Sequence, residues 1–224
     1  ELILDTRTGL RHDYRRKGGV LHSEIIAPAH TPEWMLSREQ LWGAVELVEK
    51  RRDAQLAREI EVALPRELHR AERLELLRGF VQREFVERGM IADVAVHDGR
   101  ARDGHGQPHA HVMLTLRELT GEGFGKKDRS WNAPDLLLGW REAWAREANM
   151  ALERAGRVER IDHRSLEVQR AEAEQQVERA RGGGQAERAL ADAAPGVELS
   201  ADPAPKSGPS GHPPQHWGHL VVGG

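Results

Sequence analysis

Hydrophobic and polar positions switch between two periods up to about residue 164. Alternation with a period of two predicts strands at residues 20–28, 59–64, 91–97 and 109–116. Apolar residues three or four apart predict amphipathic helices at residues 37–57, 74–85 and 134–156, the first opened by a capping box of Ser37 and Gln40. The order β-α-β-α-β-β-α indicates an α+β fold, with an antiparallel or mixed sheet and helices packed on one face.

The composition changes near Gly182. Residues 183–224 contain six of the chain's eleven prolines and few large apolar side chains, so we expect a disordered tail there. Residues 168–182 are rich in Glu, Arg, Ala and Gln without a broad apolar stripe, which predicts a polar helical linker. The expected folded domain is therefore residues 1–167.

Composition and charge narrow the classes of protein further. The formal net charge is −3, so any contact with nucleic acid needs local basic clusters. Cysteine is absent, which excludes disulfides, thiolate metal sites and cysteine nucleophiles and fits a reducing compartment. The chain has no apolar run of about 18 residues and no signal-peptide pattern at its start. Because it opens with Glu1 rather than Met, we expect it to begin inside a longer protein.

Three histidines form the most specific chemical pattern. Strand alternation places His109 and His111 on one face of their strand, and His97 shares a face with Asp93 on the preceding strand. The Gly-rich loop between the two strands predicts a hairpin that brings His97 beside His109. Three imidazoles on adjacent strands suit a divalent metal such as Zn, Mn, Ni or Fe. The alternatives are a polar strand face without metal, and His105 in place of His97 as third ligand.

Residues 108–117 (PHAHVMLTLR), preceded by His97, resemble the signature of HUH endonucleases and, more narrowly, of MobA/MobL-type plasmid mobilisation relaxases. Other stretches agree with that family: residues 13–20, 41–42, 57–60, 63–68, 89–90, 140–141 and 160–165. The resemblance spans residues 1–167 and implies an HUH-type sheet. It also implies a bacterial, cytoplasmic DNA nickase, with one divalent metal ion (Mg, Mn, Zn or Ni) on His97, His109 and His111.

The resemblance also implies a reaction and its partners. A tyrosine attacks a DNA phosphodiester at the plasmid origin of transfer in a site- and strand-specific, metal-assisted transesterification. The expected partners are single-stranded or supercoiled plasmid DNA and accessory relaxosome proteins. A carboxylate accepts the phenolic proton or holds a ligand histidine in the correct tautomer. Glu59 is the first candidate for this role and Asp93 the second, against the alternative that both are solvated strand carboxylates.

The nucleophile is harder to place. Tyr14 is the only tyrosine in the chain. The family's attacking tyrosine usually lies in an Ala-Tyr-Arg-type segment near the N-terminus, and the Asp-Tyr-Arg segment here follows that position. We therefore expect an N-terminally truncated fragment whose nucleophile lies upstream of Glu1, with Tyr14 as the second candidate.

Basic clusters mark the expected DNA surface. Lys and Arg neutralise phosphates, and an exposed Trp can stack on a base of single-stranded DNA. The candidates are Arg11, Arg15, Arg16, Lys17, Lys126, Lys127, Arg129 and Trp131. The alternatives are an ordinary solvated surface and, for Trp131, packing at the entry to the last helix. Trp140 and Trp144 are expected in the core.

Three functions stay open from the sequence. The first is a relaxase that cuts DNA and initiates conjugative mobilisation. The second is a non-catalytic fragment that binds single-stranded DNA but lacks the nucleophilic tyrosine. The third, a metal-dependent hydrolase of another substrate, rests on the histidines alone.

Overall fold

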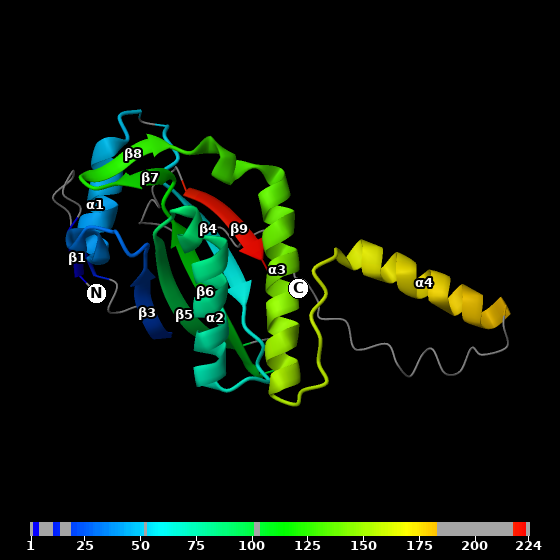
Figure 1. Ribbon diagram of the computed structural model, residues 1–224. Coiled ribbons are helices and arrows are strands. Elements are labelled where there is room, and N and C mark those ends of the chain that lie inside the picture. The colour runs from blue at the N-terminus through cyan, green and yellow to red at the C-terminus, as the bar shows by residue number, and fades with distance from the viewer. Residues whose placement is uncertain are drawn as a thin grey trace.

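The computed structural model describes residues 2–4, 11–13, 19–51, 53–100, 104–182 and 217–222. Its centre is a five-stranded sheet in the order β3-β5-β6-β4-β9 (Figure 1). The strands are β3 (Val20–Ile26), β4 (Ala57–Ala63), β5 (Ala92–Arg100), β6 (Gly106–Leu114) and β9 (Trp217–Val222). The α-helices are α1 (Arg38–Val48), α2 (Arg70–Glu84), α3 (Pro134–Arg154) and α4 (Leu166–Gly182).

Short elements join these parts. Two small hairpins pair β1 (Leu2–Leu4) with β2 (Arg11–Asp13) and β7 (Arg117–Thr120) with β8 (Gly123–Lys127). Three 3₁₀ turns precede or follow helices: η2 (Glu33–Leu36), η3 (Val86–Arg88) and η4 (Arg129–Asn132). No helix in the described ranges is long and apolar enough to cross a membrane.

Helices α2 and α3 cover one face of the sheet (Figure 1). Alternate strand residues such as Ile60, Val94 and Val112 point into the core, because successive side chains of a strand face opposite sides. Phe80 of α2 packs edge-to-face on Trp144 of α3, with ring centroids 5.1 Å apart. The predicted α+β architecture, with helices on one face of a mixed sheet, is confirmed.

Helix α1 differs from the sequence prediction in its N-terminal cap and in the residue at which it ends. Ser37 directly precedes α1, but its side chain makes no capping hydrogen bond. The expected capping box is therefore wrong. Helix α1 ends at Val48 rather than near residue 57. The reason is Glu49, which adopts an extended conformation and binds Arg117 Nε at 2.9 Å and Lys127 Nζ at 3.0 Å. This pairing ties the end of α1 to the β7–β8 hairpin.

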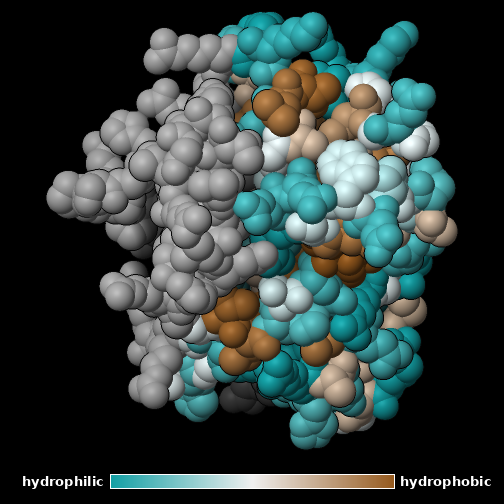
Figure 2. Space-filling view, turned by 90° about the vertical axis from the view of Figure 1, so that its left-hand side faces the viewer, coloured by the Kyte–Doolittle hydropathy of each residue, from teal (hydrophilic) through white to brown (hydrophobic). Residues whose placement is uncertain are grey.

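The β7–β8 hairpin was not predicted. It packs on a second, smaller core made of Met35, Leu41 and Ile91, to which Leu119 and Phe124 add apolar surface. The side of the molecule that carries α1 and β3 is largely hydrophilic, with separate small apolar patches (Figure 2).

Within residues 183–224, where we expect a disordered tail, the structure describes only residues 217–222. These residues form β9, which pairs with β4 in parallel. The physical reason is the apolar run Leu220-Val221-Val222, whose two valines are β-branched and suit a strand at a sheet edge. Residues 183–216 and 223–224 lie outside the described residues, and α4 occupies the stretch expected to form a polar helical linker.

Candidate functional site

The β5–β6 hairpin brings three histidines together on the sheet face opposite α2 and α3. His97 lies directly across from His109. His111 lies two residues further along β6, across from Ala95. The ring centroid of His97 is 5.5 Å from that of His109 and 5.2 Å from that of His111. The centroids of His109 and His111 are also 5.2 Å apart. Each imidazole therefore has the other two as neighbours, whereas His105 lies in the exposed loop at the hairpin end.

Two of these rings are oriented through Nδ1. His111 Nδ1 lies 2.7 Å from Glu59 Oε1, which comes from the neighbouring strand β4. His109 Nδ1 lies 2.9 Å from the backbone oxygen of Gln107. Both partners are acceptors, so both Nδ1 atoms donate and Nε2 is the ring nitrogen left to bind a ligand. Such contacts to a carboxylate or backbone carbonyl are the usual way in which proteins orient metal-binding histidines.

The contact with Glu59 also changes the acidity of the imidazole. The hydrogen bond to Glu59 raises the pKa of His111 above its ordinary value, and the negative charges of Glu59 and Glu61 act in the same direction. Partial burial of the ring opposes this effect but does not cancel it.

The donor set suits a borderline divalent ion, since three neutral imidazoles leave open coordination positions. In the arrangement that the described residues adopt, however, no group of three or more His, Cys, Asp or Glu side chains is placed to hold a metal ion. Metal binding by His97, His109 and His111 therefore stays a prediction that rests on the chemistry of the donors.

Asp93 does not belong to the open histidine surface, contrary to the prediction. Its side chain is almost fully buried and accepts hydrogen bonds from Arg38 Nε at 2.7 Å and Trp42 Nε1 at 2.9 Å. A second bond from Arg38 makes the guanidinium contact bidentate. Asp93 therefore anchors α1 to β5, and its carboxylate is already engaged by these donors.

Residues 1–188 match the model of the MobA/MobL family. The chain belongs to this family. It is 39% identical over 188 residues to the probable conjugal transfer protein TraA of Sinorhizobium fredii, covering 70% of this chain and 17% of that protein. It is 37% identical over 202 residues to the mobilization protein MobL of Acidithiobacillus ferridurans, covering 77% and 53%.

Further comparisons agree with this family assignment. The 43 kDa relaxation protein of Salmonella typhimurium is 35% identical over 162 residues, covering 62% of this chain and 43% of that protein. A solved structure, described as the molecular basis of vancomycin resistance transfer in Staphylococcus aureus, superposes with a TM-score of 0.67. It is 31% identical in sequence and covers 74% of this chain and 86% of that one. The MobA/MobL chain thus spans about half or less of these curated relatives.

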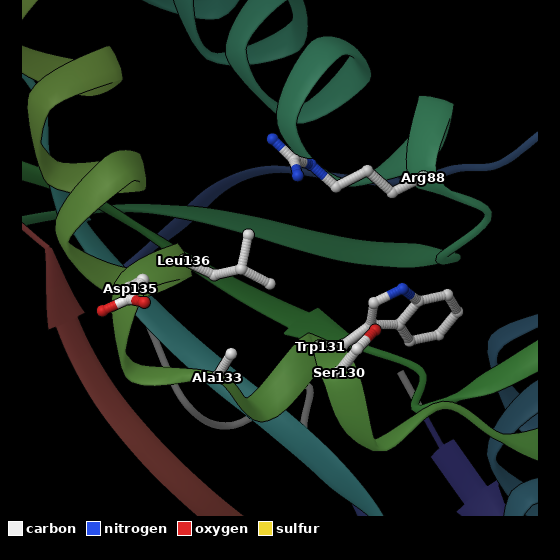
Figure 3. A pocket seen from close by; sticks show the side chains of 6 residues that line it. All are labelled: Arg88, Ser130, Trp131, Ala133, Asp135 and Leu136. Carbon is white, nitrogen blue, oxygen red and sulfur yellow. The ribbon is translucent and has the colours of Figure 1, made fainter.

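Two of the expected DNA contacts of the MobA/MobL chain, Trp131 and Lys127, are engaged by other parts of the protein. Trp131 is only 6% exposed and belongs to the core cluster under α2 and α3, because η4 folds it inward just before α3. The edge of its ring borders a pocket of about 480 Å³, together with Arg88, Ser130, Ala133, Asp135 and Leu136 (Figure 3). Lys127 is held by Glu49 and by the backbone oxygen of Gln55. The ring of Trp131 is thus packed inside the protein, and the ammonium group of Lys127 is engaged by these two acceptors.

The structure describes the exposure of only two of the remaining basic candidates. Lys126 and Arg129 are exposed, as a phosphate contact requires. Arg11 lies in β2, and Arg15, Arg16, Lys17 and Tyr14 lie outside the described residues.

Sequence reasoning missed two interactions at this face. The backbone oxygen of Gln107 orients His109, and because every residue has such an oxygen, the residue type at this position gives no sign of the contact. Arg38 and Trp42, which bind Asp93, come from a helix far away in sequence.

Proposed function

We propose that this MobA/MobL chain is the DNA-processing region of a relaxase, which makes a site- and strand-specific cut at a plasmid origin of transfer. The printed names of its relatives, conjugal transfer, mobilization and relaxation proteins, support this role. The observation that carries the proposal is the cluster of His97, His109 and His111 beside Glu59. DNA at the origin of transfer is the proposed substrate, and accessory relaxosome proteins are proposed partners.

The proposed chemistry assigns a role to each residue of the cluster. His97, His109 and His111 would hold one divalent ion (Mg, Mn, Zn or Ni), which would supply positive charge against the charge developing on the scissile phosphate. Glu59 and the Gln107 carbonyl hold His111 and His109 with Nδ1 protonated, so that each Nε2 remains a ligand. Because the Glu59 carboxylate engages His111, we assign Glu59 to positioning rather than to proton acceptance.

The covalent step is a transesterification at phosphorus. A tyrosine oxygen forms a bond to the phosphate and loses its proton, while the bond to the 3′ oxygen breaks. The products are a 5′-phosphotyrosyl link and a free 3′-hydroxyl. Tyr14 is the only tyrosine of the 224 residues, and it lies in an Asp-Tyr-Arg segment rather than in the family's usual Ala-Tyr-Arg-type segment.

DNA binding and cleavage should therefore separate in these 224 residues. With an oligonucleotide that spans the transfer origin of the host plasmid, we expect binding that weakens steeply with salt, since Lys and Arg contact phosphates. We expect little covalent adduct on a denaturing gel in the presence of Mg²⁺ or Mn²⁺.

Each other outcome of this assay has a definite meaning. A strong adduct that disappears in Tyr14→Phe makes Tyr14 the nucleophile. An adduct that survives Tyr14→Phe excludes tyrosine chemistry by these 224 residues. Absence of DNA binding would contradict both the relaxase proposal and the non-catalytic DNA-binding function.

Glu59→Gln should lower the affinity for Mn²⁺ by about 10–100-fold, because the outer contact of a ligand histidine is lost or weakened. Glu61→Gln is the matched control, since it removes the same charge from the same strand and leaves the Glu59–His111 contact in place. Calorimetric titration measures both affinities. The ¹⁵N shifts of His111 report whether Nδ1 stays protonated. Equal losses in the two variants, with the His111 tautomer unchanged, would show that Glu59 acts by charge alone.

A further inference from the structure

Strand β9 stands apart from the rest of the sheet. The other neighbouring strands, β3–β5, β5–β6 and β6–β4, are all antiparallel, whereas β9 is parallel to β4 over six residue pairs. It lies at the edge of the sheet beside β4 (Figure 1) and follows α4 in the described part of the chain. The outer edge of β4 is therefore completed by a segment about 160 positions further along the sequence.

That edge adjoins the histidine cluster. Strand β4 pairs with β6 on one side and with β9 on the other. In this register Glu59 lies between Met113 of β6 and His219 of β9. Without β9, the strand that carries Glu59 would be an edge strand with unpaired N–H and C=O groups on its outer side.

The pairing of β9 has the properties of a reversible contact. Its pairing with β4 is one parallel ladder of six residues, and Gly218 inside the strand weakens that ladder. Strand β9 also contacts α3. The apolar run from Leu220 to Val222 favours the docked state. The cost of closing the connection grows only slowly with its length, and tethering keeps the segment at a high local concentration.

We propose that Trp217–Val222 is a strand latch, which docks reversibly in cis on the outer edge of β4 and thereby holds Glu59 in contact with His111. The docking itself is independent of any chemistry at the histidines. Its effect on the site rests on the proposed function, in which Glu59 positions a metal-binding imidazole.

Amide hydrogen exchange of the full chain tests the docking. Leu220→Pro removes a strand N–H from the centre of β9, and Gly223→Pro is the control just beyond the strand. In Leu220→Pro we expect the protected amides of β4 to exchange roughly tenfold faster or more, while those of β5 residues 92–96 stay within about twofold of the unmodified chain. Gly223→Pro should leave both strands unchanged. Unchanged exchange in β4 of Leu220→Pro would overturn the latch.

Titration of the same variants with Mn²⁺ tests the effect on the site. We expect Leu220→Pro to bind Mn²⁺ several-fold more weakly than Gly223→Pro, and a chain ending at His216 to match Leu220→Pro. Faster exchange in β4 without loss of affinity would overturn the link between the latch and Glu59. A full chain that binds no Mn²⁺ would instead contradict the proposed metal site, and the exchange result alone would then decide the latch.

Discussion

Replacing both His109 and His111 with alanine is expected to lower the affinity of the chain for Mn²⁺ or Ni²⁺ by roughly 100-fold or more, because a single imidazole lacks the ligand count that transition ions prefer. The two rings lie within 5.5 Å of His97 and of each other, so their loss leaves His97 as the last imidazole of the cluster. Calorimetric titration gives both the affinity and the stoichiometry, which we expect to be about one ion per unmodified chain.

His105→Ala is the control for this measurement. His105 comes from the adjoining hairpin loop and is exposed, so its loss should leave the affinity nearly unchanged. A fall in affinity comparable with that of His97→Ala would make His105 the third ligand. Unmodified affinity in the double variant would exclude metal binding at these histidines altogether.

Strand alternation explains why this part of the site could be predicted. Residues two apart on a strand share a face, so the spacing of His109 and His111 is enough to place both rings on one side of the sheet. The short hairpin loop makes β5 and β6 neighbours, which brings His97 to them. Glu59 follows from the same rule, because its strand has Ile60 on the buried face.

The errors came from contacts between segments far apart in sequence. Alternation put Asp93 on the histidine face, but its surroundings depend on where α1 lies, and no local pattern states that. The burial of Trp131 depends on how η4 turns into α3. The pairing of β9 with β4 joins residues about 160 positions apart, and a local composition argument cannot detect such a pairing.

Charge alone also proved a weak guide to the DNA surface. Lys127 belongs to a basic run, yet it closes an ion pair with Glu49 that fastens the β7–β8 hairpin to the end of α1. Lys126, its immediate neighbour, is exposed. Adjacent strand residues point to opposite sides, so two lysines in a row cannot both serve the same surface.

Asp93→Ala is expected to destabilise the fold by about 3–5 kcal/mol, because it breaks a buried ion pair on one side only. The side chain of Asp93 is 7% exposed and that of its partner Arg38 is 20% exposed. The substitution removes the acceptor of the Arg38 fork and of Trp42 Nε1, while both donors remain on α1 facing β5. The midpoint of urea unfolding, followed by Trp fluorescence and by circular dichroism, measures the loss.

Asp53→Ala provides the matched control, since Asp53 also forms a bidentate contact with an arginine, Arg51, but on the exposed surface. Solvent screens such a pair, so its removal should leave the unfolding midpoint unchanged. Equal effects of the two substitutions would contradict the role of burial.

Asp93→Ala should also raise the rate of amide exchange more in α1 than in α2. The reason is that Asp93 ties α1 to β5, whereas α2 is held by the main core. Loss of α1 protection in this variant, with the histidine rings still in contact, would show that the anchor and the candidate site share strand β5 but act independently.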